Sequence, residues 1–340
     1  PGGRGDGVDV EVVGRRRGCD APTETSRGGM LSSADELAGL SLTRIAAAVD
    51  EIDPVFLRTP QYVDERLSAA LGREVVVKAE TLNPIGSFKG RGTWLLAQQL
   101  DPASTWVCST AGNFGQGLAY AARPRHAAVH AFVSPEVPLA KVERMRALGA
   151  RVETFEQPGS AAREHAAADE DRVLVVDGLR PEMAEGAGTI GLELQAAGPF
   201  AIAVVQIGDG ALISGIARWL KATTPTTRII GACASGAPAM ARSFAARRPI
   251  STAGTDTIAT AIAVADPIPE SVARVLALVD DVVLVDDDDL RYAQRLIAES
   301  LGLLVEPAGA AGVAALARHR ERLPGGRAAV VLTGAGAPGA

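Results

Sequence analysis

Short, almost entirely apolar runs of strand length recur through the second half of this chain and limit its possible folds more than any other feature. Strands with one face in water alternate polar and apolar residues, so these runs are typical of strands covered on both faces. They span residues 202–207, 228–232, 282–285 and 328–332. Helical patterns separate the runs, and strands that alternate with helices predict a parallel sheet with crossover helices.

The same alternation begins near residue 42 and fills the first half of the chain. Strands are expected at residues 74–78, 106–109, 127–133, 151–155 and 172–176. Helices are expected at residues 42–52, 90–99, 115–122, 141–148, 160–168, 188–196, 212–221, 239–246, 269–278, 290–301 and 310–318. The whole pattern therefore predicts an α/β protein.

The length of 340 residues suits two ordinary domains. We expect two three-layer α/β domains with mostly parallel sheets. Residues 103–174 would form a small domain, and residues 30–102 would join residues 175–340 in a large one. The cleft between two such domains is a common ligand site, so the binding site is expected there.

The first 29 residues differ from the rest of the sequence. They contain eight glycines and the run Arg15-Arg16-Arg17, and they show no apolar periodicity. We therefore expect residues 1–29 to be a disordered tail. Ser33 followed by Glu36 matches a helix N-cap, so the functional chain is expected to begin at Met30.

The charge balance and the few cysteines exclude several classes of function. There are 34 Lys and Arg residues against 40 Asp and Glu residues, which gives a formal net charge of -6 and no basic field for nucleic acid. No apolar run reaches the roughly 18–20 residues that a membrane span needs. Three cysteines without a CxxC pair predict neither a disulfide framework nor a metal site. We expect a cytoplasmic protein that acts on small molecules.

A lysine in an unusual setting is the first candidate for chemistry. Residues 83–92 read Asn-Pro-Ile-Gly-Ser-Phe-Lys-Gly-Arg-Gly, in which Pro and Gly form a turn, Ser87 can cap a helix and Lys89 falls in the first helical turn. The positive end of a helix dipole disfavours an ammonium, so we expect a lowered pKa for Lys89, as suits a Schiff base. A surface lysine beside a turn explains the segment equally well.

Two glycine-rich loops follow expected strands and lead into expected helices. In residues 109–117 the backbone N–H groups can form an anion site fit for a carboxylate, and Asn113 adds an amide, although an ordinary strand-to-helix turn explains this loop by itself. In residues 207–215 the same arrangement points backbone donors at a phosphate. The second loop is not a dinucleotide fingerprint, because Ile213 stands where the last glycine belongs.

Two further polar residues lie where ligands bind in open α/β sheets, at the carboxyl ends of strands. Glu306 belongs to the segment Val-Glu-Pro-Ala-Gly of residues 305–309, and Thr333 follows the last expected strand. Taken alone, Glu306 is explained as an acid at a helix N-terminus and Thr333 as the end of a strand.

In their order and spacing these segments resemble the fold-type II pyridoxal-phosphate enzymes, and among them the threonine/serine dehydratases most. The resemblance extends from Arg58-Thr59-Pro60 to the C-terminus, and residues 188–193 and 257–259 contribute to it. It implies pyridoxal 5′-phosphate as the cofactor, held in the cleft between the domains. It also implies an amino-acid substrate and a homodimer.

The resemblance further implies a role for individual residues. Lys89 would bind the cofactor as a Schiff base and transfer the α-proton, Phe88 would pack beside its ring, and Asn113 would hydrogen-bond its phenolic oxygen. Thr333 would face the ring nitrogen. The phosphate would be held by Gly208, Asp209, Gly210, Ala211 and Leu212. The substrate carboxylate would be held by Thr110, Ala111, Gly112 and Asn113. Ser87 and Glu306 would support the site, with the role of Glu306 left open.

Departures from the family pattern refine this expectation. Ala111 stands where racemases of the family carry an acid/base serine, so racemisation is not expected. Asp209 replaces a glycine, and its carboxylate would repel the phosphate unless the side chain turned away. Cys233 replaces the acid of metal-binding members, so no metal is expected. The neutral hydroxyl of Thr333 would leave the ring nitrogen unprotonated, which favours elimination over transamination.

We therefore expect a pyridoxal-phosphate-dependent ammonia-lyase, or dehydratase, that acts on threonine or serine. A β- or γ-replacement synthase is the main alternative, and residues 257–261 resemble threonine synthase in this respect. A cofactor-binding homologue without activity is a further alternative. The altered loop at Asp209 allows it, whereas retention of Lys89 and Asn113 argues against it.

Overall fold

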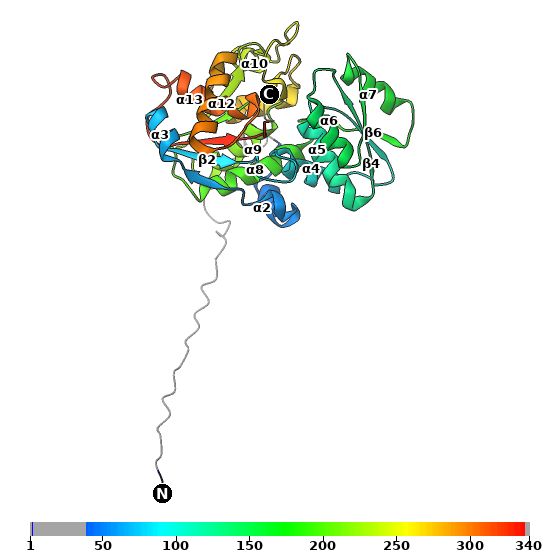
Figure 1. The fold of residues 1–340 in the computed structure, drawn as a ribbon, viewed down its shortest axis with the longest axis horizontal. Coiled ribbons are helices and arrows are strands. Elements are labelled where there is room, and N and C mark those ends of the chain that lie inside the picture. Colours follow the sequence, from blue (N-terminus) through cyan, green and yellow to red (C-terminus); the bar gives the residue numbers. More distant parts are fainter. Residues whose placement is uncertain (1, 3–38, 337–340) are drawn as a thin grey trace.

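The computed structural model describes residue 2 and residues 39–336. The expectations for the N-terminal tail, for Met30 and for the cap at Ser33 and Glu36 lie outside these residues. Figure 1 shows two groups of strands and helices, one on each side of helix α4 (Lys89–Gln98). Helix α4 packs against helices of both groups, α8 (Pro181–Gln195) and α5 (Asn113–Ala122).

The larger sheet has six strands in the order β1-β2-β10-β7-β8-β9. Only the edge pair β1–β2 is antiparallel. The strands are β1 (Gln61–Val63), β2 (Val75–Ala79), β7 (Ile202–Gln206), β8 (Arg228–Ala234), β9 (Asp281–Val285) and β10 (Ala328–Leu332). Every residue of β2, β7 and β10 is buried, as the continuous apolar runs predict for strands covered on both faces.

Helices cover both faces of this sheet. One face packs against α8, α9 (Ala211–Thr223) and α11 (Pro269–Leu278), and the other packs against α3 (Glu65–Leu71), α12 (Asp287–Leu301) and α13 (Pro307–Arg318). The remaining helices of this group are α2 (Leu42–Glu51) and α10 (Ala239–Ala246). At the start of α12, Asp286 and Asp289 form a capping box, in which the side chain of each residue accepts the backbone N–H of the other.

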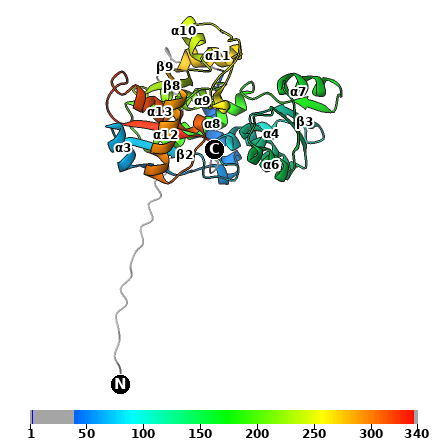
Figure 2. The same ribbon diagram turned by 45° about the horizontal axis from the view of Figure 1, so that its top comes forward.

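The smaller sheet has four parallel strands in the order β5-β4-β3-β6. The strands are β3 (Thr105–Ser109), β4 (Ala128–Val133), β5 (Arg151–Thr154) and β6 (Arg172–Leu174). Its helices are α5, α6 (Leu139–Ala147) and α7 (Pro158–Ala167), which Figure 2 shows gathered around the sheet. The expected class, α/β with mostly parallel sheets, is therefore confirmed.

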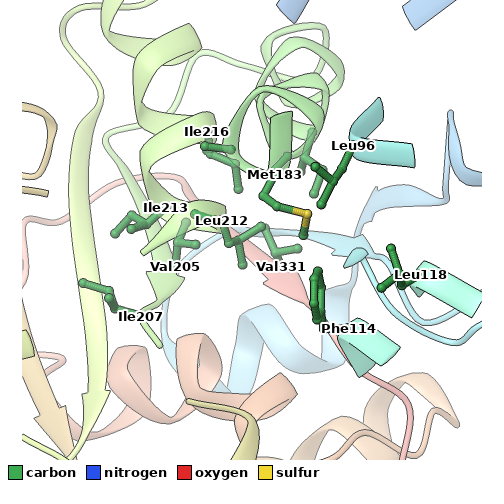
Figure 3. Close-up of a cluster of buried hydrophobic side chains, with 14 of the residues drawn as sticks. Leu96, Phe114, Leu118, Met183, Val205, Ile207, Leu212, Ile213, Ile216 and Val331 are labelled. Carbon is green, nitrogen blue, oxygen red and sulfur yellow. The ribbon is translucent and has the colours of Figure 1, made fainter. Parts of the chain in front are cut away.

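One hydrophobic cluster runs through both groups of elements. Phe114 of α5 lies beside Met183 of α8 and Val331 of β10 in this cluster, to which Leu118 of α5 also belongs (Figure 3). Because protein interiors are close-packed, this shared core fixes the position of α5 relative to the larger sheet. Within residues 39–336, no helix combines the length and the apolar character that crossing a membrane requires.

Helix α8 starts earlier than the sequence pattern predicts, at Pro181 instead of residue 188. Proline suits the first turn of a helix, whereas the glycines of this segment obscure the helical pattern. The glycines allow close packing of α8 on its neighbours. A Cβ added at Gly186 of α8 would lie 2.6 Å from the Cα of Gly92 in α4, so only glycine fits there.

Candidate active site

A cavity lies where loops from both sheets meet, and the loops come from the carboxyl ends of β3, β6, β7 and β10, as expected for parallel sheets. The residues that line it are Phe88, Lys89, Ser109, Thr110, Ala111, Asn113, Phe114, Asp177, Gln206, Gly208, Asp209, Gly210, Leu212, Ala261, Ile262, Glu306, Ala308 and Thr333. Most of the residues singled out from the sequence therefore come together here, although they are up to 245 positions apart.

Three expected site residues lie just behind this lining. The Oγ of Ser87 accepts a hydrogen bond from the Lys89 backbone N–H at 3.3 Å. Gly112, at the start of α5, has a φ of 119° and precedes the lining residue Asn113. The Ala211 N–H donates to the Asp209 side chain. These residues shape the loops that carry the lining side chains.

The Lys89 amine is bound by two carboxylates. Its Nζ lies 2.6 Å from Asp177 Oδ2, 2.8 Å from Asp177 Oδ1 and 3.1 Å from Asp209 Oδ2. The Lys89 side chain is only 10% exposed. The loop after β6 brings Asp177 close to the glycine loop, since a Cβ added at Gly178, where φ is +77°, would lie 2.8 Å from Asp209 Cβ. Hydrogen bonds between two charged groups, as in this cluster, are stronger than hydrogen bonds between neutral groups.

The expectation of a lowered pKa for Lys89 is wrong. Burial lowers the pKa of this amine, but the charges and hydrogen bonds of Asp177 and Asp209 outweigh burial and raise it above 10.5. Burial and the neighbouring Asp209 raise the pKa of Asp177 to about 6, although the Lys89 ammonium opposes this shift. Burial also acts to raise the pKa of Asp209, but Lys89 and the Ala211 N–H lower it overall.

The Asp209 side chain faces the cavity and does not turn away from it. Its Oδ1 accepts the Ala211 N–H at 2.7 Å, and its Oδ2 contacts Lys89 Nζ. The Ala211 N–H is one of the donors that a helix N-terminus leaves free for an anion. Asp209 therefore supplies a negative charge at the start of α9.

Glu306 joins the two sheets of the molecule across the cavity. Its Oε1 accepts the Asn113 Nδ2–H at 2.7 Å, and its Oε2 lies 2.5 Å from Lys141 Nζ. Asn113 begins α5 and Lys141 belongs to α6, whereas Glu306 precedes α13 of the larger group. Glu306 thus fixes the direction of the Asn113 amide and ties the smaller group of elements to the larger one.

The loop after β3 is shaped by one hydroxyl. Thr110 Oγ1 accepts the backbone N–H groups of Gly112, at 2.9 Å, and Gly115, at 3.1 Å. Ala111 lies at the tip of this loop and presents a methyl group to the cavity. A methyl group cannot carry a proton, so the absence of racemisation stays a prediction that rests on the identity of this residue.

A pair of polar side chains, Gln206 and Thr333, lies at the carboxyl ends of the neighbouring strands β7 and β10. Gln206 Nε2 donates to Thr333 Oγ1 at 2.7 Å, and it also lies 3.1 Å from the Ala308 carbonyl oxygen and 3.2 Å from that of Val331. Gln206 Oε1 is buried and has no hydrogen-bond partner among the described residues. Both side chains line the cavity.

Sequence reasoning missed Asp177, Gln206 and Lys141. An acid directly after an expected strand was a signal for Asp177, and a polar residue inside an apolar run was a signal for Gln206. No local signal marks Lys141, because its partner Glu306 is 165 positions away.

Comparison with known proteins assigns the chain to a family. The family model described as "Pyridoxal-phosphate dependent enzyme" matches residues 52–334. The L-threonine ammonia-lyase of Geobacter sulfurreducens is 34% identical over 304 residues, which cover 87% of this chain and 75% of that protein. Among solved structures, the T.th. threonine deaminase has a TM-score of 0.81 and 30% identity over 87% of this chain and 98% of that one. Maize serine racemase has a TM-score of 0.79 and 28% identity over 88% of this chain and 94% of that one. The chain therefore belongs to the family of pyridoxal-phosphate-dependent enzymes, with the fold of their type II members and pyridoxal phosphate as its cofactor.

Proposed function

We propose that this protein is an ammonia-lyase that eliminates water from a small β-hydroxy amino acid such as L-threonine or L-serine. The products would be a 2-oxo acid and ammonia. The observation that carries the proposal is the position of the Lys89 amine, which shares one cavity with Asn113, Thr333 and the start of the 208–212 loop. Relatives named for threonine ammonia-lyase and threonine deaminase support the same substrate class.

The donors of the cavity fit pyridoxal phosphate. The start of α9 offers N–H groups for the phosphate, and Lys89 offers the amine for the aldehyde. The buried and unpartnered Oε1 of Gln206 shows hydrogen-bonding capacity that the described residues leave unused. The Asp209 carboxylate opposes the phosphate, and in this proposal its side chain moves off the Ala211 N–H when the phosphate binds.

The cofactor supplies an electron sink for the bonds at the substrate Cα. Lys89 Nζ takes the proton from Cα, and this proton and the departing β-hydroxyl together make the water that is released. The released enamine hydrolyses to the 2-oxo acid and ammonia. The backbone N–H groups of Ala111 and Asn113 hold the substrate carboxylate, because those of Thr110 and Gly112 already donate to the Phe132 carbonyl oxygen and to Thr110 Oγ1. The methyl of Ala111 leaves no second proton carrier at that position.

The test is an assay of 2-oxo acid formation with purified enzyme and no second substrate. Serine, threonine, 3-hydroxyaspartate and O-substituted serines are compared, with Lys89→Ala as the control. Formation of 2-oxo acid from serine or threonine, lost in Lys89→Ala, supports the lyase. A product that appears only when a second nucleophile is supplied contradicts it and favours a replacement synthase.

The proposal includes a homodimer in the cytoplasm. The edge strand β1 supports the dimer, because it leaves one strand edge unpaired and exposes Tyr62 and Val63. The free, buried thiols of Cys108 and Cys233 suit a reducing compartment. Light scattering of the purified protein tests the dimer, and fractionation of cells tests the cytoplasmic location.

A further inference from the structure

The amide of Gln206 has only one satisfactory orientation. Its Nε2 faces two backbone carbonyl oxygens, those of Ala308 and Val331, and carbonyl oxygens only accept hydrogen bonds. Exchanging the amide oxygen and nitrogen would place Oε1 against both of these oxygens without a proton between them. The Nε2 group therefore stays on this side. Of its two protons, one is donated to Thr333 Oγ1, the nearest acceptor at 2.7 Å, and the other is shared between the two carbonyl oxygens at 3.1 and 3.2 Å.

This orientation decides whether the Thr333 hydroxyl accepts or donates its hydrogen bonds. The hydroxyl has one proton and two lone pairs, and one lone pair is taken by the Gln206 donor. Among residues 39–336 the Thr333 hydroxyl donates no hydrogen bond to another protein group. Thr333 is buried and lines the cavity, so its proton is free to be donated into the cavity.

The ring nitrogen is the cofactor group that matches this donor. The aldehyde is matched by the Lys89 amine, and the phosphate by the N–H groups at the start of α9. A pyridine nitrogen without a proton accepts a hydrogen bond from a hydroxyl, whereas a protonated one needs an acceptor. An aliphatic hydroxyl is too weak an acid to give up its proton to the ring.

We propose that Gln206 is a positioning residue that fixes the Thr333 hydroxyl as a donor to the ring nitrogen and thereby keeps this nitrogen unprotonated. An unprotonated ring is a weaker electron sink, so it favours expulsion of a β-substituent over reactions that need a long-lived carbanion. The inference rests on the cofactor of the family. Only its consequence for elimination rests on the proposed lyase function.

The test is the ¹⁵N chemical shift of the ring nitrogen in holoenzyme loaded with ¹⁵N-labelled pyridoxal phosphate. Wild type and Thr333→Ser should both show a neutral, hydrogen-bonded pyridine nitrogen. Thr333→Val and Gln206→Met should both shift this signal to that of a pyridine without a donor. The double variant should match the single ones, because both substitutions break one hydrogen-bond chain. We expect either single substitution to weaken cofactor binding about fivefold to tenfold.

Two results would overturn the proposal. One is a protonated ring nitrogen in the wild type, which would make the unpartnered Gln206 Oε1 the acceptor. The other is a wild-type signal in Gln206→Met together with a changed signal in Thr333→Val. If Gln206→Met does not fold, the wild-type signal and the comparison of Thr333→Ser with Thr333→Val still decide the direction of the bond. An enzyme that binds the cofactor but turns over neither threonine nor serine would refute the proposed function and leave this test intact.

Discussion

Lys89 Nζ lies 2.6 Å from Asp177 Oδ2, so the amine that is expected to carry the cofactor is bound to a carboxylate from the loop that follows β6 of the smaller sheet. An ammonium has no lone pair to attack an aldehyde. Loading of the cofactor therefore requires Lys89 to lose a proton that Asp177 and Asp209 help it to keep. The same carboxylates make the free amine a stronger base, which suits the removal of a Cα proton.

Replacing Asp177 by Asn should lower the pKa of Lys89, because the first of its two carboxylate partners loses its charge. We expect a fall of about one to three pH units in the midpoint at which Lys89 becomes reactive. Competitive acetylation of the cofactor-free protein over a pH series, read at the Lys89 peptide by mass spectrometry, measures it. Asp280→Asn, which removes the charge from the more exposed pair with Lys221, is the matched control. An unchanged Lys89 midpoint in Asp177→Asn contradicts the account.

The raised pKa of Asp177 predicts a pH dependence of stability. A carboxyl whose pKa is higher in the folded state than its ordinary 3.8 stabilises the fold at low pH, and this contribution is lost as the pH rises through about 6. Asn at this position stays neutral at every pH. The melting temperature of the wild type should therefore fall relative to that of Asp177→Asn between about pH 4 and about pH 7. Parallel curves for the two proteins would show that Asp177 has an ordinary pKa.

Asp209→Gly should strengthen binding of phosphate-bearing ligands, because it removes the carboxylate that occupies the Ala211 N–H. The charge at a helix N-terminus is worth up to about 2 kcal/mol in a partly buried site, so we expect tighter binding by about tenfold or more. Titration with pyridoxine 5′-phosphate, which carries the phosphate but no aldehyde, measures this step without reaction at Lys89. Asp177→Asn is the control, since it also releases Lys89 but keeps Asp209. Equal effects of the two substitutions would assign the change to Lys89 instead.

Arg91 of α4 forms a buried ion cluster with Glu80 and Glu193, and this cluster should stabilise the fold. The Arg91 guanidinium donates to both carboxylate oxygens of Glu80 at 2.8 Å and to Glu193 Oε1 at 2.7 Å, and the Arg91 side chain is fully buried. Arg91→Met should lower the free energy of unfolding by about 3–5 kcal/mol, because it leaves buried charge uncompensated. Urea unfolding measures the change. Arg291→Met removes the partner of the exposed Asp288 and should cost at most about 1 kcal/mol. Similar losses in both variants would contradict this assignment.

Much of the fold could be predicted from the sequence, because long elements with apolar faces reveal their period. The expected ranges 239–246, 269–278 and 328–332 coincide with α10, α11 and β10. Short elements such as β1 and α3 were missed, since seven residues or fewer carry little periodicity. The glycines of α8 obscured its first two turns, because their purpose is contact with other helices and not helix formation.

The sequence indicated which residues gather in the cavity better than it indicated the pKa values of their side chains. Lys89, Asn113 and Thr333 belong to recognisable segments, and the structure places all three in one cavity. The sequence-based pKa of Lys89 had the wrong direction, because the local helix start was visible and the two carboxylates 88 and 120 positions away were not. Charge in a buried site depends on contacts that no local pattern encodes.

The most direct test of the whole account is the identity of the residue that carries the cofactor. The chain has four lysines, and of these only Lys89 lines the cavity, whereas Lys78, Lys141 and Lys221 lie outside its lining. Purified protein is incubated with pyridoxal phosphate, reduced with borohydride and digested, and the modified peptide is found by mass spectrometry. The account predicts a reduced cofactor adduct on Lys89 that is absent from Lys89→Ala. An unmodified Lys89, or an adduct confined to another lysine, would contradict it.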